Sequence, residues 1–340
     1  MKVLILGAGS IGNHMAFGCS LLGWCVSMYD PDPEALMRTR TSIYPKRYGA
    51  WNEEIELLTV KPGDYSSYDL LIIGTPPEYH TQIALEALER GSRNILVEKP
   101  LSMPKDGRLA ELQRVVSQKS ANLFVGYNHT VSPSYKAFVG LVKALRTRDV
   151  KLQIECRWQE DWEGIFKAHP WLDGPSDSYL GFTERGGGAA CEHSHGLHML
   201  LHTATVLERS LHLVKVDVHV CDTDKSSYDD SLELVFSDDH QSEYIYISDV
   251  NTWPPKKSIS VSLDNNDRVS WHIDTEKSKD IVEFMIGGES GSFSYDKNRR
   301  LDFVYELVSI ADAIGKHSQE SSLCLEHALN VQSVLSKVFG

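Results

Sequence analysis

The first twelve residues, MKVLILGAGSIG, place a short apolar run directly before a GxGxxG motif. In an α/β unit, such glycines allow a tight turn between the first strand and the first helix, and a close approach of the backbone to a pyrophosphate. The positive end of that helix favours the negative charge. This order of strand, glycine turn and helix constrains the fold most, because it is typical of a parallel sheet covered by helices.

Short β-rich runs alternate with helical patterns through the first third of the chain. Strands are predicted at residues 2–6, 24–29, 57–60, 69–75, 94–98 and 122–126, and helices at 10–22, 33–40, 78–90 and 104–118. The strands are apolar on both faces, as in a sheet that helices cover on both sides. We therefore predict an NAD-binding Rossmann domain, a doubly wound parallel sheet, over residues 1–126.

The pattern changes after about residue 150 to longer strands in which apolar and polar residues alternate. Strands are predicted at 149–158, 211–220, 231–236, 242–250 and 258–263, and helices at 195–207, 300–315 and 323–338. The sequence thus predicts an α+β domain over residues 127–340, with a large, mostly antiparallel open sheet that serves substrate binding and oligomerisation. Its C-terminal helices are expected to pack back on the first domain.

Composition restricts the class of partner. The 340 residues carry a formal net charge of −13, which disfavours nucleic acid and anionic membrane surfaces. The six cysteines are scattered without a CxxC pair, so neither a zinc ribbon nor a disulfide framework is predicted. No run approaches the ~18 to 20 apolar residues of a membrane helix. A cytoplasmic protein with a small-molecule substrate is expected.

Asp30 ends the second predicted strand, in VSMYD. A carboxylate at this place can accept hydrogen bonds from ribose hydroxyls, and it would repel a 2′-phosphate. NAD is therefore expected over NADP. The alternative is that Asp30 only caps the helix that follows it. From the glycine motif and this strand end we predict cofactor contacts by Gly7, Gly9, Ser10, Ile11, Gly12 and Asp30.

Two further strand ends point to the same crevice, because ligands of such sheets bind beyond the carboxyl ends of the strands. One is GTPPEYH, with Thr75, Pro76 and His80, and the other is VEKP, with Glu98 and Lys99. We predict that Thr75, Pro76, His80 and Glu98 contact the cofactor. His80 could equally tie the loop together, and the bond before Pro100 could be cis.

Residues 186–202, GGGAACEHSHGLHMLLH, join three glycines to four histidines and a glutamate. Glu192, His195, His198 and His202 are three or four residues apart, so one helix face can carry them all. That spacing would also suit zinc, with His198, His202 and Glu192 as ligands. Hydride chemistry needs no metal and the glycine run is explained as a turn aimed at a ligand, so no metal site is predicted.

Taken in order, GAGSIG, the strand-ending Asp30, GTPPEYH, VEKP, VGYNH and GGGAACEHSHGLH resemble the Gfo/Idh/MocA oxidoreductases, the family of glucose-fructose oxidoreductase and inositol dehydrogenase. The resemblance covers nearly the whole chain and matches the subset with GGG, an acidic residue four positions on, and Ser-His. It implies that Lys99 and His195 face nicotinamide and substrate, that Asn128 lies at the cofactor, and that the second sheet forms an oligomer interface.

The match departs from the family's pattern at two informative positions. His198 stands where the subset has an aspartate, and Thr130 stands where arginine is frequent after VGYN. The second change removes a contact to an anionic substrate group, so the substrate is expected to differ from the common ones.

Oxidation of an alcohol by a nicotinamide requires that the hydroxyl lose a proton to a nearby base. Histidine has an ordinary pKa near 6.5, so His195 is predicted to be the acid/base. Lys99 would orient and polarise the substrate oxygen. The reverse assignment is open, since burial beside a positive nicotinamide could bring the pKa of a lysine close to neutrality.

Substrate contacts are predicted for Trp158, Glu192 and His198. For Trp158 the reason is that flat aromatic faces suit sugar rings. Trp158, Trp162 and Trp171 precede the glycine run, and the alternative is that each is a core or interface residue.

The function predicted is an NAD-dependent oxidoreductase of carbohydrate metabolism that acts on a secondary alcohol or ketone of a sugar, sugar nucleotide, sugar derivative or cyclitol. One alternative is a redox-assisted lyase or glycosidase that recycles a tightly bound NAD, and another is a non-catalytic NAD sensor. A homodimer or homotetramer is expected, because the open sheet must be covered.

Overall fold

The computed structural model describes every residue except 146–149, 169–171, 317 and 319. Trp171, named above, lies outside the described residues. The chain divides into two compact units. The first unit consists of Met1–Ser102, Asp106–Asn128 and Arg299–Glu326, and the second of Met103–Lys105, His129–Asn298 and His327–Gly340. Each unit contains one sheet.

The sheet of the first unit is six-stranded and parallel, in the order β3-β2-β1-β4-β5-β6. The strands are β1 (Lys2–Leu6), β2 (Cys25–Tyr29), β3 (Glu56–Leu58), β4 (Leu70–Ile73), β5 (Asn94–Val97) and β6 (Asn122–Val125). The residues of β4 are fully buried, as expected for an inner strand covered on both faces. This is the predicted doubly wound Rossmann sheet.

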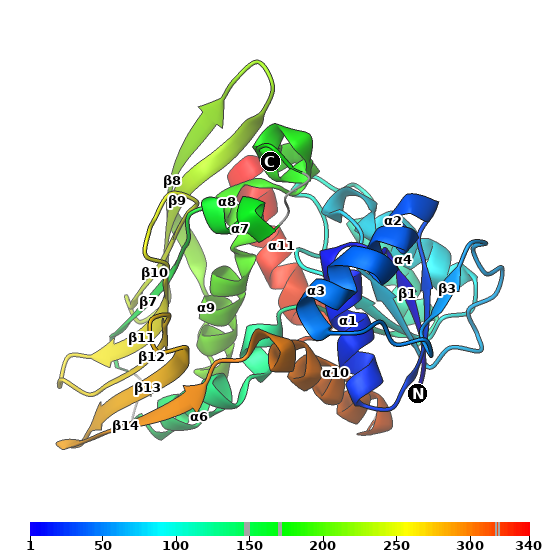
Figure 1. Ribbon diagram of the computed structural model, residues 1–340. Coiled ribbons are helices and arrows are strands. Elements are labelled where there is room, and N and C mark those ends of the chain that lie inside the picture. Colours follow the sequence, from blue (N-terminus) through cyan, green and yellow to red (C-terminus); the bar gives the residue numbers. More distant parts are fainter. Residues whose placement is uncertain (146–149, 169–171, 317, 319) are drawn as a thin grey trace. The chain divides into compact units, whose positions relative to one another are not determined.

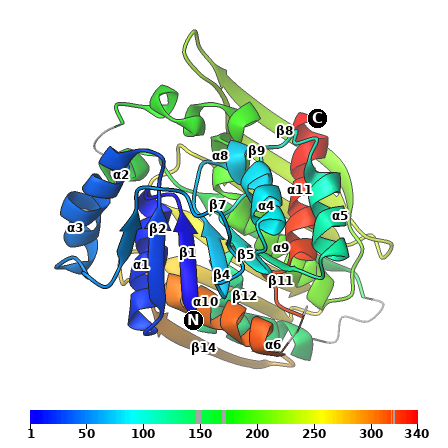
Figure 2. The same ribbon diagram turned by 90° about the vertical axis from the view of Figure 1, so that its right-hand side faces the viewer.

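Helices accompany this sheet (Figure 2). They are α1 (Ser10–Leu21), α2 (Pro33–Arg38), α3 (Tyr44–Tyr48), α4 (His80–Glu89), α5 (Leu109–Gln118) and α10 (Arg299–Lys316). Helix α1 packs against α10 and α3, and α4 packs against α5. Helix α5 begins five residues later than predicted, because Pro104 and the turns that follow precede it.

The sheet of the second unit is eight-stranded, in the order β14-β13-β12-β11-β7-β10-β9-β8 (Figure 1). Only the β7–β10 pair is parallel, so the sheet is mostly antiparallel, as predicted. The strands are β7 (Leu152–Gln159), β8 (His212–Asp222), β9 (Ser227–Ser237), β10 (Glu243–Asp249), β11 (Lys256–Leu263), β12 (Arg268–Asp274), β13 (Lys279–Ile286) and β14 (Glu289–Asp296).

The central strands bury one face and leave the other polar. On β7, Ile154, Cys156 and Trp158 are buried and alternate with more exposed polar residues. Helix α9 packs on the buried face of β7, β10 and β11, and α6 packs on β12 and β13. The helices of this unit are α6 (Pro133–Ala144), α7 (Glu163–Ala168), α8 (Gly188–Glu192), α9 (Ser194–Val206) and most of α11 (Leu325–Phe339).

Among the described residues of the second unit, the helices α6, α7 and α8 and the strands β12, β13 and β14 were not predicted. Strand β14 reads ESGSFSYD and is exposed over most of its length, so its glycine and serines give no apolar alternation. No helix in the described ranges has the length and hydropathy that crossing a membrane requires.

Candidate active site

The glycine turn between β1 and α1 is shaped by two close backbone approaches. Gly7 has φ +108°, and a Cβ there would lie 2.8 Å from the carbonyl oxygen of Gly74. A Cβ on Gly12 would lie 2.0 Å from the carbonyl oxygen of Gly7. At Gly9, by contrast, a Cβ would meet no described atom within 4 Å beyond its chain neighbours. The middle glycine therefore faces open space, where a ligand can approach the backbone.

Helix α1 starts at this open side with Ser10 and Ile11. Among the described residues no side chain caps it, and its first turn carries no acidic residue. Its first N–H groups and the positive end of its dipole are therefore available to an anion. The residues fit the pyrophosphate of a dinucleotide.

Asp30 lies just beyond β2 and beside the glycine turn. The Ala8 N–H donates to its Oδ2 at 2.8 Å, and the Asp32 N–H donates to its Oδ1 at 2.9 Å. Helix α2 is capped by Asp32, whose Oδ1 accepts from the Glu34 N–H at 2.9 Å. Asp30 is thus not the cap of α2. Each of its oxygens can accept a further hydrogen bond, so the carboxylate fits ribose hydroxyls.

His80 joins the ends of β4 and β5. Its Nδ1 lies 2.9 Å from the Pro100 carbonyl oxygen and its Nε2 lies 2.7 Å from the Thr75 carbonyl oxygen. The ring is fully buried, and burial lowers its pKa. Each ring nitrogen contacts the backbone of one of the two loops, which favours a role of His80 in holding these loops together over a contact with the cofactor. The Lys99–Pro100 peptide bond is cis.

The remaining predicted cofactor residues stand at these strand ends. Thr75, Pro76 and Lys99 are partly exposed within the described structure, whereas Glu98 and Asn128 are buried. The buried Glu98 has a neighbour that the sequence did not suggest. A Cβ built on Gly126 would lie 2.7 Å from Glu98 Oε2 and 3.2 Å from Glu306 Oε1.

Glu306 comes from α10 and is fully buried. Neither of its oxygens has a hydrogen-bond partner among the described residues. Burial, and then the charges of Glu98 and Asp302, raise its pKa well above its ordinary value. Glu306 therefore lies beside the strand end that carries Lys99, in surroundings that favour the neutral form of its carboxyl group. No local motif marks this residue, because α10 is far along the chain from β5.

Arg47 is a second residue that the sequence did not indicate. Its Nη1 donates to Ser10 Oγ at 2.9 Å and to the Ser10 carbonyl oxygen at 3.2 Å. Burial lowers its pKa, although a guanidinium stays charged at any pH at which the protein is folded. The cation lies at the first residue of α1.

In the second unit, the glycine run turns the chain from Thr183–Arg185 into α8 and α9. Gly188 has φ +79°, and a Cβ there would lie 1.9 Å from Oδ1 of Asp229. His195 is the second residue of α9 and is partly exposed. The next residue, Gly196, packs closely, since its Cβ would lie 2.8 Å from the Tyr246 ring and 2.9 Å from Trp158 Cβ.

The four histidines of this segment divide into separate environments. His193 is buried, with its Nδ1 3.2 Å from Ser248 Oγ on β10. His198 is buried, and its ring lies 6.2 Å from the rings of the partly exposed His202 and His327, measured between ring centroids. Burial, and then His327 and Lys143, lower the pKa of His202 to about 4. Glu192 ends α8 and is partly exposed.

His195 lies in a group of aromatic rings. His129 is edge-on to it at 4.9 Å, and Trp158 is tilted against it at 5.7 Å. Trp158 is only 2% exposed and stacks on Trp271 at 6.4 Å, so it supports His195 from the core. His129 was not singled out by sequence reasoning, although it follows Asn128 within VGYNH.

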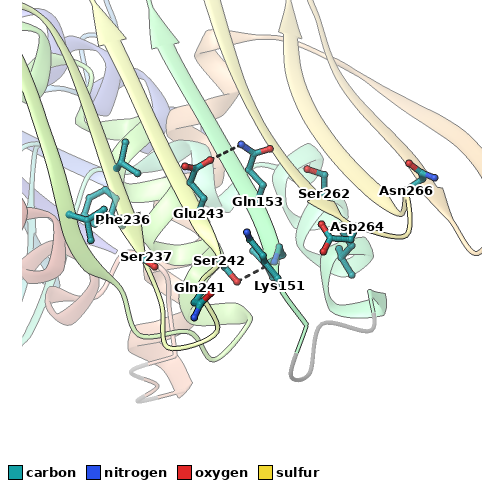
Figure 3. A pocket seen from close by; sticks show the side chains of 14 residues that line it. Lys151, Gln153, Phe236, Ser237, Gln241, Ser242, Glu243, Ser262, Asp264 and Asn266 are labelled. Atoms are coloured by element: carbon teal, nitrogen blue, oxygen red, sulfur yellow. Dashed lines mark hydrogen bonds between the residues drawn. The ribbon is translucent and has the colours of Figure 1, made fainter.

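A cavity of about 800 Å³ lies on the second sheet (Figure 3). It is lined mainly by polar residues of β7, β9, β10 and β11, and Gln153 donates to Glu243 across it at 3.0 Å. Its described lining contains none of the predicted site residues. Across the described parts of the chain, no group of three or more histidine, cysteine, aspartate or glutamate residues is placed to hold a metal ion.

A comparison with known protein families supports the description of the first unit as a dinucleotide-binding domain. Residues 1–127 match the family model GFO_IDH_MocA, "Oxidoreductase family, NAD-binding Rossmann fold". No curated protein sequence matches the chain. On the family match, the chain is an oxidoreductase whose N-terminal domain binds a nicotinamide dinucleotide.

Several solved structures share the fold over the whole chain. The 3-ketoreductase KijD10 from Actinomadura kijaniata, in complex with NADP and TDP-benzene, has a TM-score of 0.75 at 13% identity, covering 100% of this chain and 97% of that one. UDP-N-acetylglucosamine 3-dehydrogenase GnnA from Acidithiobacillus ferrooxidans has a TM-score of 0.70 at 14% identity, covering 99% and 96%. GenD2 from gentamicin A biosynthesis, in complex with NAD, has a TM-score of 0.73 at 15% identity, covering 100% and 93%.

Proposed function

We propose that the protein is a dehydrogenase or reductase that acts on a secondary alcohol or ketone of a sugar, a sugar nucleotide, a sugar derivative or a cyclitol. The observation that carries the proposal is the glycine turn with Asp30 beside it, in a segment that matches an NAD-binding oxidoreductase family. Two proteins of the same fold support the substrate class, since one is a 3-ketoreductase and the other a UDP-N-acetylglucosamine 3-dehydrogenase.

The cofactor proposed is NAD. The carboxylate of Asp30 would accept hydrogen bonds from ribose hydroxyls and repel a 2′-phosphate. Since one protein of this fold was crystallised with NADP and another with NAD, the fold accommodates both, and the side chain after β2 has to decide between them.

When bound, a nicotinamide supplies the acceptor or donor of hydride. The chain's own residues must then handle the proton and hold the substrate oxygen. We assign proton transfer to His195, whose ordinary pKa is close to neutrality, and orientation of the oxygen to Lys99. In oxidation, His195 would take the proton of the hydroxyl group while the carbon that bears this group gives up hydride. In reduction, His195 would return a proton to the carbonyl oxygen.

The test is a panel of sugars, cyclitols and sugar nucleotides mixed with the protein and NAD or NADP, while reduced nicotinamide is followed by absorbance. NADH formation with one class of compound is expected, and Lys99→Met and His195→Asn should each lower kcat by at least about 100-fold. Matched controls are Lys105→Met and His219→Gln, which replace exposed residues. An EDTA-treated sample should retain full activity.

Two other results would redirect the assignment. Turnover without net NADH, with cofactor that stays bound, would identify a redox-assisted lyase or glycosidase. Bound NAD without any turnover across the panel would identify a sensor. Analytical ultracentrifugation of the same sample tests the homodimer or homotetramer that we propose from the open sheet.

A further inference from the structure

Asp229, on β9, lies directly against the glycine turn of the second unit. The side chain is fully buried. Thr183 Oγ1 donates to its Oδ1 at 2.7 Å, and the Ala190 N–H donates to its Oδ2 at 2.7 Å. The Asp229 N–H in turn donates to Thr183 Oγ1 at 2.9 Å. One carboxylate therefore fixes the chain both before and after the three glycines.

The turn and this carboxylate are fitted to each other. A Cβ on Gly188 would overlap with Oδ1 of Asp229, at 1.9 Å, and would also lie 2.9 Å from Thr183 Oγ1. The glycine at 188 is thus required by a protein side chain that occupies the space beside it. Because hydrogen bonds of 2.7 Å from Thr183 and Ala190 hold this carboxyl group in place, small shifts of the turn are resisted.

Strand β10 holds the same short helix and the residue that follows it. Ser248 Oγ donates to the Ala189 carbonyl oxygen at 3.3 Å, and Tyr246 Oη donates to the His193 carbonyl oxygen at 2.8 Å. Helix α8 is therefore attached to β9 through Asp229 and to β10 through these two hydroxyls. Since α9 starts two residues after α8 ends, the position of His195 follows that of α8.

We propose that Asp229 is a positioning residue for His195, which it places by anchoring the glycine turn and the start of α8. This role for Asp229 depends on the proposed function in one respect, namely that His195 is the acid/base. An ionised Asp229 accepts both hydrogen bonds. A protonated Asp229 has one oxygen that must donate, so the hydroxyl of Thr183 has to reverse for the pair to persist.

The charge state of Asp229 is accordingly part of this role. Burial raises the pKa of Asp229 to about 7, against the opposing effects of the Thr183 and Ala190 donors. The charged neighbour that adds to this rise is Asp230, whose own carboxylate lies 2.7 Å from His219 Nδ1. Both charge states are therefore populated near neutral pH, and His195 is expected to respond to the change between them.

The experiment compares Asp229→Ala with Asp229→Asn. The asparagine can keep its oxygen on the Ala190 N–H while its NH₂ donates to Thr183 Oγ1, so it preserves the anchor without the charge. The matched control is Asp238→Asn, which changes another buried carboxylate, bound to Arg209 and Tyr244 just beyond the other end of β9. NMR spectra of the cofactor-free protein then follow the Ala190 amide and the His195 ring protons.

In Asp229→Ala the Ala190 and His195 resonances should both move, and kcat should fall by about 10- to 100-fold while NAD affinity stays unchanged. In Asp229→Asn the part of the pH-dependent shift of the His195 resonance that follows the titration of Asp229 should disappear. The titration of the His195 imidazole itself should remain, both in this resonance and in kcat. Asp238→Asn should leave both resonances in place.

Wild-type positions of both resonances in a folded Asp229→Ala protein would overturn the proposal, whether or not a substrate is known. Where that variant does not fold, Thr183→Val replaces it, with smaller shifts in the same direction expected and unchanged resonances contradicting the role. Shifted resonances in a protein that turns over nothing on the panel would instead reject the proposed function and leave the positioning role standing.

Discussion

The glycine turn at residues 7–12 and the glycine turn at residues 186–188 both lead into a helix, and both contain positions where a Cβ would overlap with a neighbouring atom. They differ in what occupies the space. A Cβ on Gly9 would meet no described atom within 4 Å beyond its chain neighbours, whereas an oxygen of Asp229 already fills the place of a Cβ on Gly188. The first turn leaves room for a ligand, and the second makes room for a side chain of the same protein.

A glycine run therefore does not by itself indicate a ligand. The sequence predicted that both runs are turns aimed at a ligand. At Gly188 a side chain of the protein itself accounts for the glycine.

The largest expected effect is on stability, at the second turn. Gly188→Ala places a Cβ against Asp229 Oδ1 at a residue with φ +79°, so the free energy of unfolding should fall by about 3 kcal/mol. Urea denaturation followed by tryptophan fluorescence measures it. Gly140→Ala, which meets no described atom within 4 Å, is the control. A loss below about 1 kcal/mol would mean that Asp229 moves aside freely, and the contrast between the turns would disappear.

At the first turn the expected effect is on binding. Gly9→Ala should change the free energy of unfolding by no more than about 1 kcal/mol, because the new methyl group meets no protein atom. It should weaken NAD binding by about 10-fold or more, since the methyl group would take the space of the pyrophosphate. Isothermal titration calorimetry gives the affinity. Unchanged affinity would show that the open side of this turn is not where the cofactor lies.

Asp30→Ser tests whether the carboxylate beside the first turn selects NAD over NADP. Removal of the carboxylate takes away both the acceptor for ribose hydroxyls and the repulsion of a 2′-phosphate, so the ratio of NAD to NADP affinity should fall by about 10-fold. Asp32→Ser, which changes the cap of α2, should leave the ratio unchanged. Equal ratios in the wild type and Asp30→Ser would remove the argument for NAD.

Within the second unit, pH should change the stabilising contributions of His202 and Asp229 in opposite directions. The pKa of His202 falls from 6.5 to about 4, so its neutral form stabilises the fold above pH 6.5, and this stabilisation is lost as pH falls toward 4. The pKa of Asp229 rises from 3.8 to about 7, so its contribution is complete below pH 3.8 and is lost as pH rises toward 7.

Each group should change stability by up to about 1.4 kcal/mol per pH unit within its window. Thermal unfolding between pH 4 and 8 tests this, with His202→Gln expected to reduce the loss on the acid side and Asp229→Asn the loss on the neutral side. Parallel pH profiles for both variants and the wild type would contradict both assignments.

The sequence by itself determined the features that depend on neighbours in the chain. The alternation of short apolar strands with helices predicted the Rossmann sheet. The glycine motif and Asp30 predicted the cofactor turn, because each of them lies where a strand is joined to the next element of the chain. Residues 1–127 match the family that these motifs resemble, while the Ser194-His195 pattern of one subset stays a prediction.

Only the tertiary structure decided which distant residues share a site. Asp229 meets Ala190 across 39 residues, His129 meets His195 because α9 packs on the strand of Trp158, and Glu306 reaches Glu98 from α10. It also brought His327, from α11, against His198 and His202 of α9. The physical reason is that such contacts depend on which strands pair and on how helices pack across them, and spacing along a single segment contains neither.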